Sequence, residues 1–422
     1  MAYTLISMIG TGMYKTSKDF EGYLETEYSF KKAHFKTRLF MQAVVQMQYK
    51  PIDQIILLGT DTSSWDCLVD TETENDDRDK TFDLWYSLCA QCEPKEGEKT
   101  PLGVSRENLD RLEKYLSRRF KLNVVIKSHT HKIDGDTSEE LFNCYTGVVD
   151  IVKKGNDILF DITHGFRSMP VLLYQSLQYS LSQNNRKVEI IYGELDMNDR
   201  SKGCIRDLST YWTYSERAAA LNVFKSKLDG FKLAELIKPY WDRGSKAITR
   251  LSEIVQTNFA FQIVEVYKQI KNALSEFPAD APDWLRQIKP VLEEVCKLVD
   301  ERSTSKTLYN YSAFLYEHQL NVQAVITLQV AVEAAVVEKY ATPEYFGDYE
   351  WWQDYGKPEL KKLKEGNWGK IGNPLTNIEA FRNQIAHGGG KDKDGNFPQT
   401  ANISNIYKNG RHGVEKLFEV LK

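Results

Sequence analysis

The chain has 422 residues, enough for two or three domains at about 100 to 200 residues each, so a short peptide or a disulfide-stabilised scaffold is excluded. Its 41% hydrophobic and 27% charged residues are typical of an ordinary globular protein. The 55 Lys and Arg residues against 59 Asp and Glu give a formal net charge of −4, which excludes a protein that coats nucleic acid through a general basic excess. A local basic pocket remains compatible with this balance.

The N-terminal stretch, MAYTLISMIGTGMYK, lacks the charged start and long apolar core of a signal peptide, and no later stretch has about 18 uninterrupted apolar residues. We therefore expect a cytoplasmic protein with no membrane-spanning segment. The six cysteines are too few and too irregularly spaced for a disulfide framework. Cys89 and Cys92 have metal-ligand spacing, but a structural zinc needs four ligands and no second pair accompanies them, so we favour chance or packing and expect no metal.

The first 195 residues alternate short apolar runs with helical patterns, which predicts a parallel sheet with crossover helices. We expect strands over residues 4–9, 54–58, 123–127, 157–162 and 188–192, and helices over about 30–47, 106–120 and 138–153. The acidic and irregular segment 66–101 is typical of an insertion with little core of its own.

After residue 194 the pattern is that of polar helices without strands. Ser215 is a good N-cap for a helix over 216–228, and residues 308–340 contain a long apolar helix in which Gln, Glu and Lys recur, as in a core helix. The sequence therefore predicts an α/β N-terminal domain followed by an all-α C-terminal half.

The loop after the expected strand 157–162 reads DITHGFRSMP and joins a buried strand to a helix. Ligands of open α/β sheets collect at the carboxyl ends of the strands, and the first N–H groups of a following helix can bind an anion. Ser168 can cap this helix, Thr163 offers a hydroxyl, Gly165 allows close backbone approach, and Arg167 can hold a phosphate with two hydrogen bonds. The loop is thus a candidate nucleotide or phosphate site.

Two other strand ends should lie at the same edge, at Gly10-Thr11-Gly12 and Thr60-Asp61-Thr62. The first lacks the third glycine of the dinucleotide fingerprint and the chain has no GxxxxGK[ST] loop, so ordinary NAD or ATP binding loses support. The alternative interpretation is that Asp161 and Thr163 cap a turn and that His164 is a solvated loop residue.

The segment Asp161-Ile162-Thr163-His164-Gly165 resembles, without a mismatch, the DxTHG motif of CRISPR-associated proteins from type III systems. In that family the N-terminal CARF domain is a Rossmann-like sensor of cyclic oligoadenylate. The resemblance implies a CARF domain over residues 1–195, a helical linker over 196–257 and a HEPN effector domain over 258–422. It also implies that the ligand contacts come from the three loops, namely Gly10, Thr11, Gly12, Thr60, Asp61, Thr62, Asp161, Thr163, His164, Gly165 and Arg167.

Near the C-terminus the segment NIEAFRNQIAHGGG predicts a helix that Thr376 or Asn377 caps and that three glycines end. Arg382 and His387 stand on its last turns. Five residues turn a helix by roughly 140°, so the two side chains converge only if the helix loosens at Gly388 or if two copies of it face each other.

The pattern Arg382-Asn383-(x3)-His387 resembles the RxxxxH motif of HEPN ribonucleases, in which two protomers form one composite cleft and no metal is used. The chemistry suits these residues. An RNA 2′-hydroxyl attacks its own adjacent phosphorus, His387 with an ordinary pKa of about 6.5 moves protons, Arg382 stabilises the phosphorane charge, and Asn383 orients an oxygen. The expected products are a 2′,3′-cyclic phosphate and a 5′-hydroxyl.

An R-x4-H string alone is weak evidence for a ribonuclease, because a His at a helix C-terminus also interacts favourably with the helix dipole. Glu333, on the long apolar helix, is a second candidate near the cleft, where we expect a hydrogen bond that fixes the motif helix. Trp351, Trp352 and Trp368 could stack RNA bases, although surface covering or dimer packing is the favoured interpretation.

Taken together, these motifs predict a homodimer, or a higher even-numbered oligomer, that cuts single-stranded RNA without a metal or cofactor once a cyclic oligoadenylate binds. The resemblance favours cyclic tetra-adenylate as the activator, with cyclic hexa-adenylate as the second possibility. One alternative is a nucleotide-sensing regulatory protein with a non-catalytic helical domain. Another is a CARF domain that also cleaves its cyclic ligand, with Thr163 or His164 at the scissile phosphate.

Overall fold

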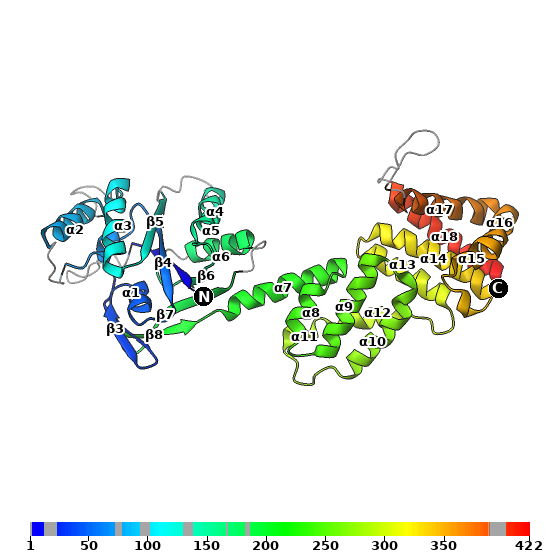
Figure 1. The fold of residues 1–422 in the computed structure, drawn as a ribbon, viewed down its shortest axis with the longest axis horizontal. Helices are drawn as coiled ribbons and strands as arrows, with labels where there is room; N and C mark the ends of the chain where they lie inside the picture. Colours follow the sequence, from blue (N-terminus) through cyan, green and yellow to red (C-terminus); the bar gives the residue numbers. More distant parts are fainter. Residues whose placement is uncertain are drawn as a thin grey trace. The chain divides into compact units, whose positions relative to one another are not determined.

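The computed structural model describes residues 2–11, 23–71, 78–92, 102–129, 138–165, 168–181, 186–386, 388 and 402–422. These residues form two compact units, Met1–Tyr214 and Ser215–Lys422 (Figure 1). The first unit is α/β and the second is helical, which confirms the expected fold class. Each unit is described by itself.

The first unit is built on an eight-stranded sheet with the order β3-β2-β8-β7-β6-β1-β4-β5. Its five parallel neighbours are the five expected strands: β1 (Tyr3–Ile9), β4 (Ile52–Thr60), β5 (Asn123–His129), β6 (Asp157–Asp161) and β7 (Val188–Leu195). Every residue of β1 is buried, as in a central strand covered on both faces. Leu5 and Ile9 pack on one face with the helices α1 (Phe40–Gln46), α2 (Arg78–Cys92) and α3 (Arg106–Phe120). Ile6 and Met8 pack on the other face with α4 (Ser138–Thr146), α5 (Val148–Ile151) and α6 (Ser168–Leu181) (Figure 1).

The sheet is mixed, which corrects two expectations. Residues 30–47 are not one helix: they contain the end of β2 (Thr26–Phe30), then β3 (Ala33–Thr37) and the short helix α1 (Phe40–Gln46). The β2–β3 hairpin turns at Lys31, whose φ of 55° is unusual for a non-glycine residue and leaves no turn signature in the sequence. A strand also follows residue 194, because β8 (Lys202–Asp207) pairs antiparallel with β7 and parallel with β2.

The helices of the first unit follow the sequence pattern more closely. α3 (Arg106–Phe120) has the expected bounds, and its N-cap Ser105 accepts a hydrogen bond from the Asn108 N–H. The expected helix 138–153 is divided into α4 (Ser138–Thr146) and α5 (Val148–Ile151), and α6 is Ser168–Leu181. The expectation of little core in 66–101 is wrong: Leu68, Leu84 and Leu88, the last two on α2 (Arg78–Cys92), are buried in the core shared with α3.

α7 (Thr210–Lys227) begins in the first unit and continues into the second, so Ser215 lies inside the helix and is not its N-cap. The other larger elements of the second unit are α8 (Phe231–Ile237), α9 (Asp242–Thr257), α10 (Ile263–Ser275), α11 (Asp283–Arg286), α12 (Lys289–Lys297), α13 (Thr304–Glu317), α14 (Asn321–Tyr340), α15 (Tyr349–Trp351), α16 (Lys357–Gly366), α17 (Asn373–Ala386) and α18 (Ile403–Leu421). Short 3-10 and π turns join them at Ala260–Gln262, Pro343–Tyr345, Trp352–Gly356 and Trp368–Gly372.

The core of the helical unit surrounds α14, against which α13, α17 and α18 pack. Within the described ranges, α14 is the one helix with the length and hydropathy of a membrane span, and 61% of that window is buried inside the unit, as in the core helix of a globular domain. Leu233 of α8 and Ile248 of α9 belong to the same core, although they lie in the expected linker 196–257.

α17, which carries the C-terminal motif, begins at Asn373 and not at a cap formed by Thr376 or Asn377. It follows the π turn Trp368–Gly372 directly, so no separate cap is needed. α18 crosses α17 at Gly410, where a Cβ atom would lie 2.3 Å from Ile378 Cδ1. The glycine thereby allows the close packing that holds the motif helix.

Candidate functional site

Three of the predicted loops meet at the carboxyl edge of the neighbouring strands β6, β1 and β4. A Cβ atom on Gly10 would lie 3.2 Å from Gly165 Cα, and the Ser64 N–H donates to the Gly10 carbonyl at 2.9 Å, so the three loops are in contact. Gly165 has a φ of 116°, a conformation that favours glycine. Of the predicted ligand residues, Gly12 and Arg167 lie outside the described residues.

Asp161 holds the β6 loop to its neighbours. Its carboxylate is fully buried and accepts hydrogen bonds from Ser7 Oγ at 2.6 Å and from the Thr163 N–H at 2.8 Å. Burial raises the pKa of Asp161, while these two hydrogen bonds act against the rise. Thr163 Oγ1 in turn accepts from the Gly193 N–H of β7 at 2.8 Å. Both side chains therefore order the loop, as the capping interpretation expects.

His164 is not a solvated loop residue. Its Nε2 accepts a hydrogen bond from the Phe40 N–H at 3.1 Å, and its ring lies edge-on to Tyr23 at 4.6 Å. Burial lowers the pKa of His164 to about 4, so the imidazole is neutral near pH 7 and carries its proton on Nδ1. The Tyr23 hydroxyl accepts from the Gly10 N–H at 2.7 Å, which links the histidine to the β1 loop.

The β4 end is also internally bonded. The hydroxyls of Thr60, Thr62 and Ser63 form a buried cluster, with Oγ1–Oγ1 of the two threonines 3.2 Å apart, and Ser63 Oγ donates to the Ile9 carbonyl at 2.8 Å. Thr11 and Asp61 are half-buried at the edge, as are Thr163, His164 and Gly165. The sheet edge thus presents backbone groups and half-buried side chains, while the buried predicted residues shape the loops.

Cys89 and Cys92 lie on the last turn of α2. The Cys92 thiol donates to the Ser63 carbonyl at 3.3 Å, and burial raises its pKa. Within the described ranges, no group of three or more His, Cys, Asp or Glu side chains is arranged to hold a metal ion.

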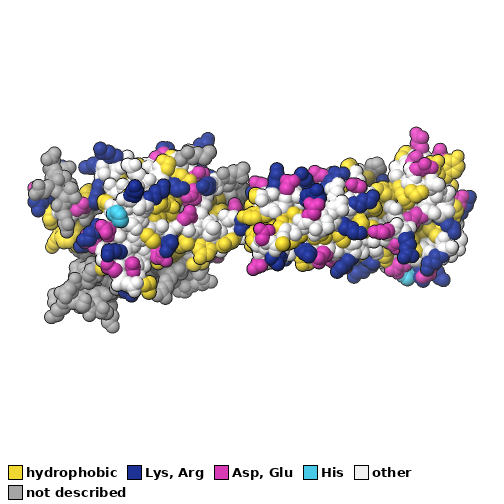
Figure 2. All heavy atoms as spheres, turned by 90° about the horizontal axis from the view of Figure 1, so that it is seen from below, with side chains coloured by type: hydrophobic (Ala, Val, Ile, Leu, Met, Phe, Trp, Pro, Cys, Tyr) yellow, Lys and Arg dark blue, Asp and Glu magenta, His cyan; other side chains and the backbone are white. Residues whose placement is uncertain are grey.

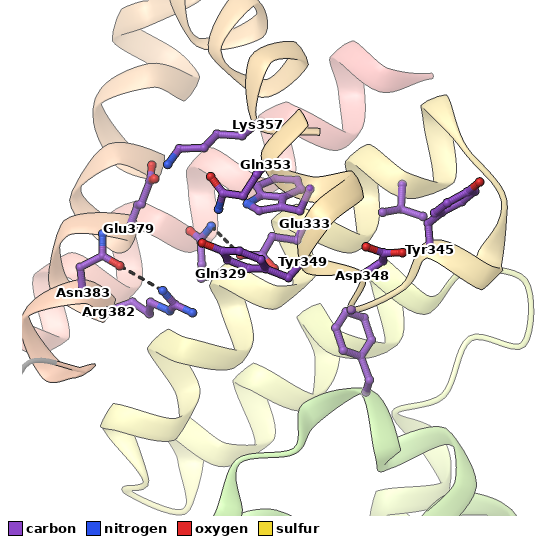
Figure 3. A pocket seen from close by; sticks show the side chains of 14 residues that line it. Gln329, Glu333, Tyr345, Asp348, Tyr349, Gln353, Lys357, Glu379, Arg382 and Asn383 are labelled. Atoms are coloured by element: carbon purple, nitrogen blue, oxygen red, sulfur yellow. Dashed lines mark hydrogen bonds between the residues drawn. The ribbon is translucent and has the colours of Figure 1, made fainter. Parts of the chain in front are cut away.

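A cavity of about 450 Å³ lies in the helical unit beside α17 (Figure 3). α14 contributes Gln329 and Glu333, and α17 contributes Arg382 and Asn383, so the structure brings together three residues that the sequence analysis singled out. The remaining lining residues come from the connections between helices and from α14, α16 and α17: Phe261, Val337, Tyr345, Gly347, Asp348, Tyr349, Trp352, Gln353, Lys357 and Glu379. His387 comes directly after Ala386, the last residue of α17, and lies outside the described residues.

Arg382 and Asn383 are exposed on the cavity side of α17, and Arg382 Nη1 donates to Asn383 Oδ1 at 3.0 Å. Figure 3 shows Arg382 extending from α17 toward α14. Glu333 does not make the expected hydrogen bond to the motif helix, because its Oε1 accepts from Gln329 Nε2 of its own helix at 3.3 Å. Burial raises the pKa of Glu333, and the nearby Arg382 charge acts against the rise. The two residues interact electrostatically across the cavity.

The tryptophans near the motif helix differ in their surroundings. Trp351 and Trp352 both pack against the core, and the Trp351 ring lies 5.7 Å from the Tyr345 ring. Trp352 also lines the cavity, whereas Trp368 is 57% exposed. Packing therefore accounts for Trp351, and Trp352 has one side on the core and another at the cavity.

Some residues that complete the cavity, among them Glu379, Tyr349 and Gln353, are not indicated by the motifs in the sequence. Glu379 pairs with Lys364, with 2.8 Å between Oε2 and Nζ, and the lysine is only 9% exposed. The spacing of Glu379 and Arg382, three residues apart on one helix, is a signal that could have placed them on the same face. No sequence signal indicated Tyr349 or Gln353, which reach the cavity from a separate connection.

Comparisons with known proteins agree with this geometry. Residues 4–195 match the family model described as "CRISPR system endoribonuclease Csx1, CARF domain". The chain is 24% identical over 97% of its length to "CRISPR-associated protein MJ1674" of Methanocaldococcus jannaschii, and it spans 66% of the length of that relative. A solved structure of Enterococcus italicus Csm6, bound to cyclic hexa-2′-fluoro-hexa-dAMP, is 11% identical and has a TM-score of 0.37 over all of this chain and 94% of that one.

The first unit is therefore a CARF domain, a Rossmann-like fold with the DxTHG loop at the end of β6. The matched domain is that of a CRISPR-associated family, and the chain is similar along most of its length to a CRISPR-associated protein.

Proposed function

We propose that the chain is an endoribonuclease of type III CRISPR antiviral defence that cuts single-stranded RNA when a cyclic oligoadenylate binds its CARF domain. The observation that carries this proposal is the pairing of Arg382 with Asn383 in a cavity of a helical unit that follows a CARF domain. His387 completes the RxxxxH pattern one residue beyond the helix.

The reaction needs a proton carrier and a source of positive charge. The RNA 2′-oxygen forms a bond to the adjacent phosphorus while the bond from phosphorus to the 5′-oxygen breaks. His387 moves the proton, Arg382 stabilises the charge on the non-bridging oxygens, and Asn383 donates to one of them. The products are a 2′,3′-cyclic phosphate and a 5′-hydroxyl. Since the substrate supplies its own nucleophile, this mechanism requires no metal or cofactor.

Two copies of α17 facing each other would bring Arg382 of one protomer near His387 of its partner, since about 140° separates them on one helix. On this ground we propose a homodimer, or a higher even-numbered oligomer. A twofold dimer suits an even-numbered ring, and cyclic tetra-adenylate is favoured over cyclic hexa-adenylate. The ring must bind the active arrangement more tightly than the resting one, because equal affinity for both shifts no equilibrium.

The helical unit has no broad surface of one charge on the face shown in Figure 2, where Lys and Arg side chains are interspersed with Asp and Glu. We therefore expect RNA affinity to be confined to the cavity, which suits an enzyme that is inactive until its signal arrives.

Cleavage of the cyclic ligand by the CARF domain gains no support from the loop. The Phe40 N–H already occupies the lone pair of His164 Nε2 that a general base needs, and Thr163 Oγ1 already accepts from Gly193. We therefore keep the CARF domain as the sensor.

The test incubates the full chain with labelled single-stranded RNA and a panel of cyclic and linear oligoadenylates in EDTA. We expect cleavage with one ring size, and its loss by at least about a thousandfold in His387→Ala. His412→Ala is the matched control, because His412 is an exposed residue of α18 that faces Glu415 at 3.7 Å. Full activity of His387→Ala would refute the ribonuclease and favour the regulatory alternative. For the sensor, Arg167→Ala with undiminished ring affinity would remove the anion-site role.

A further inference from the structure

The cavity beside α17 is lined by more groups than the binding of a phosphate requires. Arg382 and Asn383 account for contacts to a scissile phosphate, yet a carboxylate, an amide and aromatic rings also line the cavity. Its volume of about 450 Å³ lies within the range of about 300 to 1,000 Å³ typical of small-ligand sites. The space therefore suits a nucleotide and not only its phosphate.

Glu333 is a cavity residue whose carboxylate has unused hydrogen-bonding capacity. Its Oε1 accepts from Gln329, and no hydrogen bond to its Oε2 is found in the part of the chain that the structure describes. The carboxylate is half-buried, and this burial raises its pKa. A carboxylate oxygen that faces a cavity can accept hydrogen bonds from N–H donors, and a bound ligand can supply them.

Among the four RNA bases, guanine presents the edge that a single carboxylate matches. Its N1–H and exocyclic N2–H lie side by side and point the same way, so both donate to the two oxygens of one carboxylate. Adenine and cytosine place a ring acceptor beside their amino group, which would face the lone pairs of the carboxylate. Uracil has one N–H between two carbonyl oxygens.

Aromatic side chains lie close enough to hold a base flat. Trp352 and Tyr349 both line the cavity, and Figure 3 shows Tyr349 among the residues around Glu333. Stacking on an aromatic ring is worth about 1 to 3 kcal/mol per base and doesn't depend on the identity of the base. Stacking thus supplies affinity and leaves the choice of base to the carboxylate.

We propose that this cavity is a guanine-recognition site, in which Glu333 accepts the N1–H and N2–H of a guanine that flanks the scissile phosphate, while Trp352 or Tyr349 stacks on the base. This inference rests on the proposed ribonuclease function and adds the base preference, with Glu333 as the specificity-determining residue.

The test uses the full chain with cyclic tetra-adenylate and with cyclic hexa-adenylate. The substrates are 2′-O-methyl strands with a single 2′-hydroxyl nucleotide, in all combinations of bases on its two sides, together with inosine in place of guanine. We expect kcat/KM to be about 10- to 100-fold higher when guanine occupies one flanking position, and the preference to shrink with inosine, which lacks the N2 amino group.

Glu333→Gln removes one of the two acceptors and should reduce the guanine preference to about threefold or less. Glu350→Gln is the matched carboxylate-to-amide control. Glu350 is an exposed residue of α15 that does not line the cavity, so this variant should keep the guanine preference.

Three results would overturn the inference: equal cleavage of all sequences by the wild type, a guanine preference that survives in Glu333→Gln, or a uniform loss on every substrate, which would assign Glu333 to the positioning of Arg382. If no RNA is cut with either ring, the proposed function fails instead. In that case the affinities for guanosine 3′-monophosphate and adenosine 3′-monophosphate, measured by tryptophan fluorescence, test whether the cavity prefers guanine, since binding needs no catalysis. Equal affinity for the two nucleotides would overturn it.

Discussion

The contact between His164 and Phe40 predicts a loss of stability in mild acid. The Phe40 N–H donates to His164 Nε2, so protonation of that nitrogen removes the acceptor and places a charge in a buried site. Burial lowers the pKa of His164 to about 4, against about 6.5 in an unfolded chain. Between these values the unfolded state binds more protons than the folded state, so stability rises with pH across this window and is lost as pH falls through it.

The size of the effect follows from the two pKa values. Relative to pH 7, the preferential protonation of His164 in the unfolded state lowers the free energy of unfolding by about 2 kcal/mol at pH 5 and by about 3 kcal/mol near pH 4. Because His164 is tied through Tyr23 to the Gly10 N–H, the same protonation should loosen the loops at the β6 and β1 ends together. Cyclic oligoadenylate affinity is then expected to fall over the same pH range.

The comparison that isolates this effect is wild type against His164→Gln, since a glutamine oxygen can replace Nε2 as acceptor and does not titrate. The free energy of unfolding is measured with urea between pH 7 and pH 4.5, and amide exchange at Phe40 gives the local readout. We expect the wild type to lose stability relative to His164→Gln as pH falls. Superimposable pH profiles, with Phe40 equally protected in both proteins at pH 5, would refute the reasoning.

Three further predictions concern packing and charge. Gly410→Ala places a Cβ 2.3 Å from Ile378 Cδ1 and should cost about 1 to 3 kcal/mol, measured as a lower Tm, whereas Gly366→Ala, with nothing within 4 Å, should leave Tm unchanged. Tyr311→Phe removes a buried hydroxyl with no hydrogen-bond partner in the described part of the chain. The free energy of unfolding should therefore stay equal or rise by up to about 1 kcal/mol, and a clear fall in Tm would contradict this. Burial raises the pKa of Glu189, but hydrogen bonds from two lysines and a tyrosine outweigh it and lower the pKa to about 2. The stabilisation of the fold by ionised Glu189 should thus be present above about pH 4 and be lost toward pH 2. Glu189→Gln should cost about 2 to 3 kcal/mol in urea unfolding at pH 7 and progressively less in acid, and a constant difference would argue against it.

Local sequence patterns are sufficient to predict the five parallel strands and the elements that carry the two motifs. Five apolar runs became the five parallel strands, because a strand buried on both faces must be apolar along its length. The DxTHG segment was placed at the end of β6, and Arg382 and Asn383 were placed on one helix, since both assignments need only neighbouring residues.

Other features depend on residues far apart in the chain. The strands β2, β3 and β8 are polar and short, and they form because they pair with one another and with β7, which no local pattern records. The segment 66–101 joins a core because Leu84 and Leu88 meet α3.

The contacts of the side chains at the two sites depend on long-range packing. Asp161 and His164, for which ligand contact stays a prediction, bond to Ser7 and Phe40, which lie 154 and 124 residues away. At the helical cavity, folding brought Glu333 and Trp352 to the motif helix, although neither belongs to the motif. The physical reason is the same in both places: a buried polar group is stabilised by whichever donor or acceptor the fold brings within reach, and the sequence does not record that distance.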